Sequence, residues 1–257
     1  MHGTSPLPNS TPPGWIDFYR RGIMVKRSQP AMKRGTLPVI VKVTRFNTVL
    51  NADARRHYSP AIATLFALAP DMMKRKIAEA NVQQGFMLSA VLQLCRDFPR
   101  TKILCVGSYE DTAYESLLKI GVRVDGMDPN VNGIDLEQFI HLNPEKKGTY
   151  DVVFSTSVLE HVANDEAFVA DVASLMAPAG FGIFTCDFKN TWTSDEPVPQ
   201  ADYRFYRSDD LSVRLLRAMP HCRLFDEPNW GEFEPDFEYE GCSYGFATFT
   251  VQRQGDS

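Results

Sequence analysis

The sequence predicts an α/β domain with a doubly wound, mostly parallel sheet that carries helices on both faces. From residue 102 onward, short apolar segments alternate with segments whose apolar residues recur at helical spacing. The chain has 257 residues, which suffices for one large domain with an extension. No run of 18 apolar residues occurs, so the sequence predicts no membrane-spanning helix.

Two segments precede the predicted α/β domain, which we place at residues 59–257 with its core at 102–253. Residues 1–14 contain four prolines among small polar residues, which predicts a disordered tail. Residues 15–58 form a basic N-terminal extension: residues 1–58 together hold ten Lys and Arg but only two Asp. The rest of the chain is acidic, with 17 Lys and Arg against 30 Asp and Glu. This asymmetry fits a peripheral membrane or other anionic partner, or a basic arm that packs on the acidic domain.

The first elements come before the alternating region. Residues 37–50 are rich in β-branched side chains and predict an extended segment. Pro70 and Asp71 open a helical pattern, and residues 81–98 form a second one that Pro99 closes. The N-terminus lacks the basic start and apolar stretch of a signal peptide, so we expect a cytoplasmic protein.

The alternating region then gives the strands and helices of the sheet. Strands are predicted at residues 102–107, 122–128, 150–157, 180–188, 221–228 and 242–253. Helices are predicted at residues 113–121, 135–142, 158–180 and 208–219. Gly121 ends the first of these helices, Pro178 and Gly180 end the third, and Ser208 caps the fourth. The acidic and aromatic stretch 231–241 predicts an exposed connection between the last two strands.

Candidate ligand-binding residues follow these strands, because ligands of open α/β sheets bind beyond the carboxyl ends of the strands. Asp128 ends the second predicted strand, 21 residues after Gly107. A carboxylate at that place accepts hydrogen bonds from ribose hydroxyls. The alternative is an Asx turn over Asp128-Pro129-Asn130.

The turn after the first strand indicates what kind of nucleoside ligand fits. It reads Gly107-Ser-Tyr-Glu-Asp-Thr112, with one glycine where a dinucleotide site has three. Glu110 and Asp111 would repel a pyrophosphate at the start of the next helix. The turn therefore disfavours NAD and FAD and favours a ligand that carries no phosphate.

Four segments in this order resemble class I S-adenosylmethionine-dependent methyltransferases: KILCVG, VDGMD, YDVVFSTSVLEHV and LMAPAGFGIFTCDF. The resemblance covers about residues 103–253 and implies a seven-stranded, Rossmann-like sheet with S-adenosylmethionine as cofactor. It departs from the family in the first turn, where D-x-G-x-G-x-G is replaced by Cys105, Gly107, Tyr109 and Asp111. The chain looks most similar to members found among glycan-biosynthesis enzymes.

The resemblance also assigns residues to the cofactor. It places Gly107, Ser108 and Tyr109 in the turn beside the cofactor and Asp128 on the ribose. It places Asp135 and Leu136 near the adenine, with Ser155 and Thr156 beneath the methionine part. Glu160 and His161 match an E-H pair that is common in one branch of the family.

Methyl transfer requires mainly alignment, and a base if the acceptor is a hydroxyl. The candidate bases are His161 and Asp187, each with a structural alternative as a helix-end or capping residue. Residues 189–207 interleave aromatic side chains with carboxylates, which suits a sugar or glycan-related acceptor. The alternatives are another small molecule, or a non-catalytic methyltransferase-like binding module.

Two further classes of ligand are not expected from the sequence. The five cysteines show no CxxC spacing and the acidic side chains no ligand spacing, so no metal site is predicted. The acidic domain carries no base-reading module, so nucleic acid is not an expected partner.

Overall fold

The computed structural model of the chain describes residues 41–98, 101–231 and 233–255. The predicted tail 1–14 and the part of the extension before residue 41 lie outside the described residues. No helix in the described part of the chain is long and apolar enough to cross a membrane.

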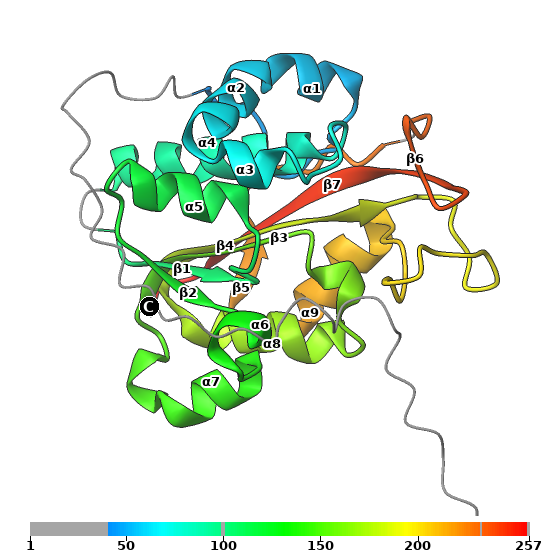
Figure 1. Cartoon of the computed structure of the whole chain (residues 1–257). Helices are drawn as coiled ribbons and strands as arrows, with labels where there is room; N and C mark the ends of the chain where they lie inside the picture. The colour runs from blue at the N-terminus through cyan, green and yellow to red at the C-terminus, as the bar shows by residue number, and fades with distance from the viewer. Residues whose placement is uncertain (1–40, 99–100, 232, 256–257) are drawn as a thin grey trace, which may run out of the picture. The chain divides into compact units, whose positions relative to one another are not determined.

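The sheet has seven strands in the order β2-β1-β3-β4-β7-β5, with β6 paired to β7 off this path (Figure 1). The first four strands of the order are parallel, and β7 runs antiparallel to β4, β5 and β6. This arrangement confirms the predicted doubly wound, mostly parallel sheet. The strands are β1 (Ile103–Val106), β2 (Val124–Met127), β3 (Tyr150–Thr156), β4 (Met176–Phe188), β5 (Cys222–Leu224), β6 (Phe237–Tyr239) and β7 (Cys242–Arg253).

Helices cover both faces of the sheet, as predicted (Figure 1). One face carries α1 (Ala52–His57), α2 (Ser59–Leu68), α3 (Pro70–Met73), α4 (Asn81–Asp97) and α5 (Thr112–Lys119). The other carries α7 (Leu136–Leu142), α8 (Asp165–Leu175), α9 (Leu216–Ala218) and the π-helical turn η3 (Asp210–Leu215). Shorter turns are α6 (Pro129–Asn132), η1 (Pro144–Lys146) and η2 (Leu159–His161).

The predicted helix 158–180 differs most from the structure. It is divided into η2 and α8, and β4 already begins at Met176. Pro178 and Gly180 therefore lie inside β4 rather than at a helix end. The pairing with β3 shifts between Tyr150↔Met176 and Val152↔Phe181, so the residues between form a bulge. The bulge accommodates Pro178, which has no backbone N–H to donate to a neighbouring strand.

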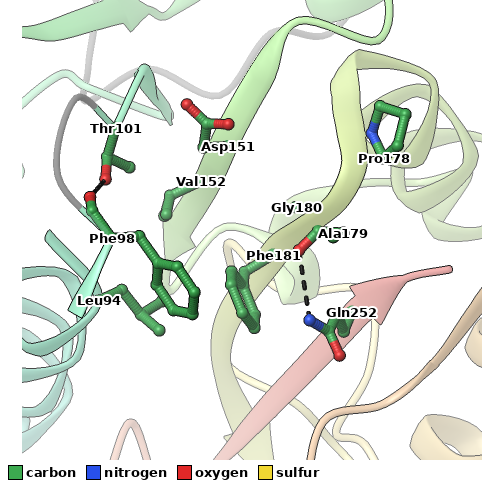
Figure 2. A pocket seen from close by; sticks show the side chains of 10 residues that line it. All are labelled: Leu94, Phe98, Thr101, Asp151, Val152, Pro178, Ala179, Gly180, Phe181 and Gln252. Carbon is green, nitrogen blue, oxygen red and sulfur yellow. Dashed lines mark hydrogen bonds between the residues drawn. The ribbon is translucent and has the colours of Figure 1, made fainter. Parts of the chain in front are cut away.

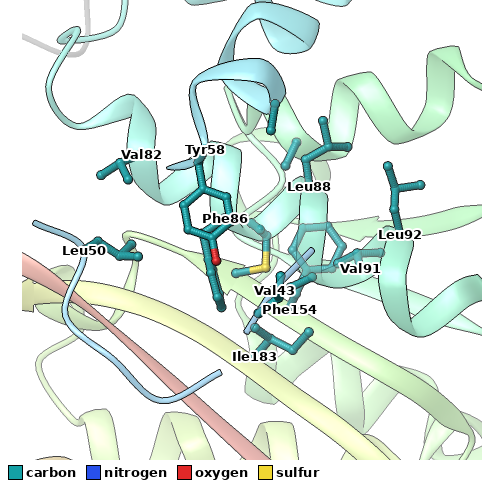
Figure 3. Close-up of a cluster of buried hydrophobic side chains, with 14 of the residues drawn as sticks. Val43, Leu50, Tyr58, Val82, Phe86, Leu88, Val91, Leu92, Phe154 and Ile183 are labelled. Carbon is teal, nitrogen blue, oxygen red and sulfur yellow. The ribbon is translucent and has the colours of Figure 1, made fainter. Parts of the chain in front are cut away.

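The core on the α4 face extends into the segment before α1. Figure 3 shows Val43, Leu50 and Tyr58 beside Phe86 of α4, over Phe154 and Ile183 of the sheet. All six side chains are buried. Residues 41–58 of the predicted extension therefore supply apolar side chains to the α/β core.

Asn47 fastens this segment to the edge of the sheet. Its amide nitrogen donates to Oδ1 of Asp226 at 2.9 Å and to the Thr250 carbonyl at 3.0 Å. Its amide oxygen accepts from the Thr250 N–H at 2.7 Å. Arg55 adds an ion pair with Asp236 at 2.5 Å. These contacts agree with the alternative in which the basic segment packs on the acidic domain.

Candidate active site

The strand order reverses between β1 and β3, because β2 lies on one side of β1 and β3 on the other. In open α/β sheets the ligand crevice lies beyond the carboxyl ends of the strands at such a point. Gly107 follows β1, Asp128 follows β2, Thr156 ends β3, and Asp187 is the last but one residue of β4. The structure thus gathers the residues that the sequence selects along one edge of the sheet.

The turn after β1 is tight at Gly107. Its φ of +86° lies in the left-handed region, and a Cβ at this position would come 2.4 Å from Cγ2 of Val158. The backbone N–H groups of Gly107 and Ser108 both donate to the Met127 carbonyl, at 2.8 and 3.2 Å. These bonds join the turn to the end of β2.

Asp128 is the carboxylate at that junction and is only 6% exposed. Its Oδ2 accepts from the Tyr109 N–H at 3.1 Å, and its Oδ1 accepts from the Asn130 N–H at 2.7 Å. The Asx turn expected as an alternative is therefore present. It does not compete with a ribose contact, since each carboxylate oxygen has a second lone pair.

The predicted adenine side lies at the start of α7. Asp135 caps this helix through a capping box with Gln138, and Leu136 is buried beside it. A surface hollow is lined here by Ile134, Asp135, Glu137, Gln138, His141 and Leu142. Asp135 therefore lines a recess at the start of α7, and Leu136 follows it in the chain.

The floor of the site is polar although it is buried. Ser155 and Thr156 end β3 and are buried. Gln83 and Gln84 of α4 are buried as well. Oγ of Ser155 and Oε1 of Gln83 have no hydrogen-bond partner among the described residues. Unpaired polar atoms in a buried position are costly, so they indicate a place for a polar ligand. Sequence reasoning missed the two glutamines, although they begin an otherwise apolar helix.

Two carboxyl groups lie together beyond β3 and β4. Glu160 is 0% exposed and Asp187 is 5% exposed. The Ser157 hydroxyl donates to Oε1 of Glu160 at 2.6 Å, and the Tyr244 hydroxyl donates to Asp187. Burial raises the pKa of Asp187 well above its usual range, and the charges of Glu160 and Asp202 add to the rise. Burial also raises the pKa of Glu160.

His161 points to a different partner. Its Nδ1 lies 2.7 Å from Oδ1 of Asp202 and 3.2 Å from the Ala201 carbonyl. Burial lowers the pKa of His161, but the hydrogen bond to Asp202 and the charges of Glu160 and Asp202 outweigh burial and raise the pKa to about 9. The imidazole is thus protonated at neutral pH and forms an ion pair.

The aromatic residues of the loop 189–207 divide into three groups. Trp192 and Phe205 lie edge to face at 6.3 Å, and Phe205 lies 4.6 Å from Tyr244 between ring centroids. Tyr206 instead donates to Asp165 at 2.9 Å, on the α8 side of the sheet, and Tyr203 is exposed. Nε1 of Trp192 has no partner among the described residues. One aromatic wall, Trp192-Phe205-Tyr244, therefore stands beside Asp187.

A second hollow lies at the opposite edge of the sheet. Figure 2 shows Phe98 and Phe181 facing one another across it, with Asp151 of β3 and Gln252 of β7 at its sides. Its volume is about 220 Å³. It opens at the amino ends of β3 and β4, away from the residues described above. In the described ranges, no group of three His, Cys, Asp or Glu side chains could hold a metal ion.

Comparison with known proteins assigns the family. A family model for a methyltransferase domain matches residues 56–233. The chain belongs to this methyltransferase family. The methyl donor of the family is S-adenosylmethionine, and the glycan subtype expected from the sequence finds no support in the comparisons.

Individual relatives of this methyltransferase are distant. A ubiquinone biosynthesis O-methyltransferase of Shewanella halifaxensis is 29% identical over 118 residues, which cover 40% of this chain and 50% of that protein. A probable S-adenosylmethionine-dependent methyltransferase of Mycobacterium tuberculosis is 22% identical over 198 residues, covering 74% and 67%. The chain thus spans about half the length of the first of these relatives.

Solved structures give a looser comparison. A 1,6-didemethyltoxoflavin-N1-methyltransferase of Burkholderia thailandensis is 17% identical, with a TM-score of 0.45. The match covers 77% of this chain and 90% of that one. At this level of similarity it carries no argument about the acceptor.

Proposed function

We propose that this methyltransferase transfers a methyl group from S-adenosylmethionine to a hydroxyl group of a small molecule. The observation that carries the proposal is the row of Gly107, Asp128, Ser155 and Asp187 along the carboxyl edge of the sheet, at the point where strand order reverses. The family match at residues 56–233 supports the choice of methyl donor.

The residues at this edge fit the donor. Asp128 would accept from the ribose hydroxyls, and Gly107, Ser108 and Tyr109 would pass along the cofactor. Asp135 and Leu136 would flank the adenine, and Ser155 and Thr156 would lie beneath the methionine part. The unpartnered atoms Ser155 Oγ and Gln83 Oε1 support a polar ligand at this place. The donor supplies an activated methyl group, so the chain has to hold and align the two substrates.

Of the two candidate bases, the geometry favours Asp187. His161 is held by Asp202 in an ion pair, and a protonated imidazole cannot accept a proton. Asp187 lies near the end of β4 beside the aromatic wall, and its raised pKa makes it a stronger base than an ordinary carboxylate. We propose that Asp187 takes the hydroxyl proton and that His161 positions Asp202.

We propose a sugar or glycan-related molecule as the acceptor. Support comes from the half-buried ring of Trp192, which packs on the buried Phe205 and Tyr244 beside the carboxyl groups, because a ring face stacks on sugar CH groups and carboxyl groups bond to hydroxyls. The second candidate is another hydroxylated small molecule, which the similarity to the ubiquinone biosynthesis O-methyltransferase of Shewanella halifaxensis favours. A peripheral membrane or other anionic partner of the basic extension stays a prediction.

A screen for methyl uptake tests this proposal. Labelled S-adenosylmethionine is incubated with nucleotide sugars, glycosides, glycolipids and phenols, and with peptides and nucleic acids as contrast. We expect label in a hydroxylated small molecule, a loss of at least about 100-fold for Asp187→Asn and a smaller loss for His161→Ala. Label only in peptide or nucleic acid would refute the proposal. Binding of S-adenosylhomocysteine without any transfer would favour the non-catalytic module.

A further inference from the structure

Glu160 is completely buried although one of its two carboxylate oxygens has no hydrogen-bond partner among the described residues. The residue is 0% exposed, and its Oε1 accepts one hydrogen bond, from the Ser157 hydroxyl at 2.6 Å. Its Oε2 has no hydrogen-bond donor among the described residues. A buried carboxylate with one unsatisfied oxygen is strongly disfavoured. The group therefore needs a proton, or a partner that brings one.

Asp187 supplies such a partner. It is the last but one residue of β4 and 5% exposed. The following loop binds the backbone of both residues, because the Tyr203 N–H donates to the Glu160 carbonyl at 2.8 Å and the Tyr206 N–H donates to the Asp187 carbonyl at 2.9 Å. The charge of Glu160 acts on Asp187, and the Tyr244 hydroxyl donates to it. Two carboxyl groups in contact cannot both ionise in a buried place, so one proton is retained between them. That shared proton satisfies the oxygen of Glu160 that otherwise has no partner.

The other charges that face the two groups are already balanced. Asp202, the third carboxylate near them, is paired with protonated His161 at 2.7 Å. In the flanking loop, Lys189 is paired with Glu196 and Arg204 with Asp165. These cations are thus engaged elsewhere, and Glu160 and Asp187 together keep one negative charge.

We propose that Glu160 and Asp187 form one carboxyl pair that holds a single shared proton and selects acceptors with a neutral hydroxyl group. The inference rests on the proposed function of the site and deepens it. As the acceptor oxygen forms its bond to the methyl group, the bond between that methyl group and the donor's sulfonium sulfur breaks, which leaves a neutral thioether. The acceptor's O–H bond breaks in the same step, and its proton passes to the pair. The pair then carries two protons and no charge, and it loses one proton to water afterwards.

This balance restricts the chemistry of the acceptor. A carboxylate or phosphate acceptor has no proton to give and would place a second negative charge beside the pair. An alcohol or sugar hydroxyl has a proton to give and brings no negative charge. Glu160 acts through Asp187 and is a positioning residue, which keeps the proton affinity of Asp187 high.

The shared proton is measured on the free protein, without cofactor or acceptor. Infrared spectroscopy at neutral pH detects the carbonyl band of a protonated carboxyl group. We expect this band in the wild type and its loss in both Glu160→Gln and Asp187→Asn. Asp111 is also buried with a raised pKa, so Asp111→Asn and Asp202→Asn serve as controls that retain the band of the pair. Circular dichroism verifies that each variant is folded.

Three results would overturn the inference: no such band in the wild type, its persistence in Glu160→Gln, or its persistence in Asp187→Asn. If Glu160→Gln does not fold, Tyr244→Phe replaces it. That variant removes a donor to Asp187, and we expect the band to titrate at higher pH, whereas an unchanged midpoint would count against the pair.

With an active acceptor, the rate of the wild type rises with pH as the pair passes from two protons to the single shared proton. In Glu160→Gln we expect the midpoint of this rise to move by at least about one unit, because Asp187 then titrates alone. If Glu160→Gln is active and its pH–rate profile does not move, the carboxyl pair is contradicted but the proposed function is not. Absence of methyl transfer in the wild type contradicts the proposed function, while the infrared result still decides about the pair.

Discussion

Nδ1 of His161 lies 2.7 Å from Oδ1 of Asp202, whose side chain is almost completely buried. The two residues come from η2 and from the loop after β4, so the ion pair ties that loop to the end of β3. The backbone repeats the connection, because the Tyr203 N–H donates to the Glu160 carbonyl at 2.8 Å. The loop that carries the aromatic wall is thereby held beside the carboxyl pair.

The first prediction concerns the titration of His161. We expect an NMR midpoint near 9 in the wild type and a clearly lower one in Asp202→Asn, because the hydrogen bond and the charge of Asp202 raise the pKa. Since this pKa is raised above the unfolded value of about 6.5, the pair stabilises the fold fully below that pH and loses its effect as the pH rises through about 9. Asp195→Asn, in the same loop, is the control. A wild-type midpoint near 6.5 would refute the ion pair.

The second prediction concerns Asn47. Asn47→Ala removes four side-chain hydrogen bonds and leaves the buried N–H and carbonyl of Thr250 without these partners. We expect a loss of roughly 2–4 kcal/mol in the free energy of unfolding, measured with urea. Asn51→Ala removes only the cap of α1 and should cost about 1 kcal/mol. Equal losses in the two variants would show that Asn47 does not fasten the segment.

The third prediction concerns the turn after β1. Gly107→Ala places a Cβ 2.4 Å from Val158 at a φ of +86°. Gly133 has a similar φ of +73° but open space around it. We expect Gly133→Ala to cost roughly 1–2 kcal/mol from its backbone alone, and Gly107→Ala to cost more. Thermal unfolding of both variants measures the difference. A Gly107→Ala protein as stable as Gly133→Ala would rule out the close approach of Val158.

The sequence predicts the sheet and its functional edge well, because the signals are local. Apolar segments that end at Gly107 and Asp128 define both the strands and the residues beyond them. The start of β4 could not be predicted in the same way. Pro178 commonly ends helices, and only the pairing of β4 with β3 shows that it lies in a bulge.

Local sequence patterns do not predict the carboxyl pair either. Glu160 and Asp187 are 27 positions apart, and Tyr244 joins them from β7. The sequence gives each residue a plausible role, but their proximity depends on the β3-β4-β7 order. The same holds for His161, whose partner Asp202 lies 41 positions later. Its role as a base is a reasonable expectation from the sequence, whereas the ion pair favours positioning.

The central claim is that the edge beyond β1 and β2 binds S-adenosylmethionine through Asp128. Calorimetric titration with S-adenosylhomocysteine tests it most directly, with NAD as the competing ligand and Asp125→Asn as the matched control. Asp125 lies in β2, three residues before Asp128, and accepts from the Tyr150 hydroxyl at 2.7 Å, which an amide oxygen can also do. We predict binding of S-adenosylhomocysteine to the wild type and to Asp125→Asn, and a loss of at least about tenfold in Asp128→Asn, since a charged hydrogen bond contributes about 1.5–3 kcal/mol. Binding of NAD without S-adenosylhomocysteine, or equal affinities in all three proteins, would contradict the account.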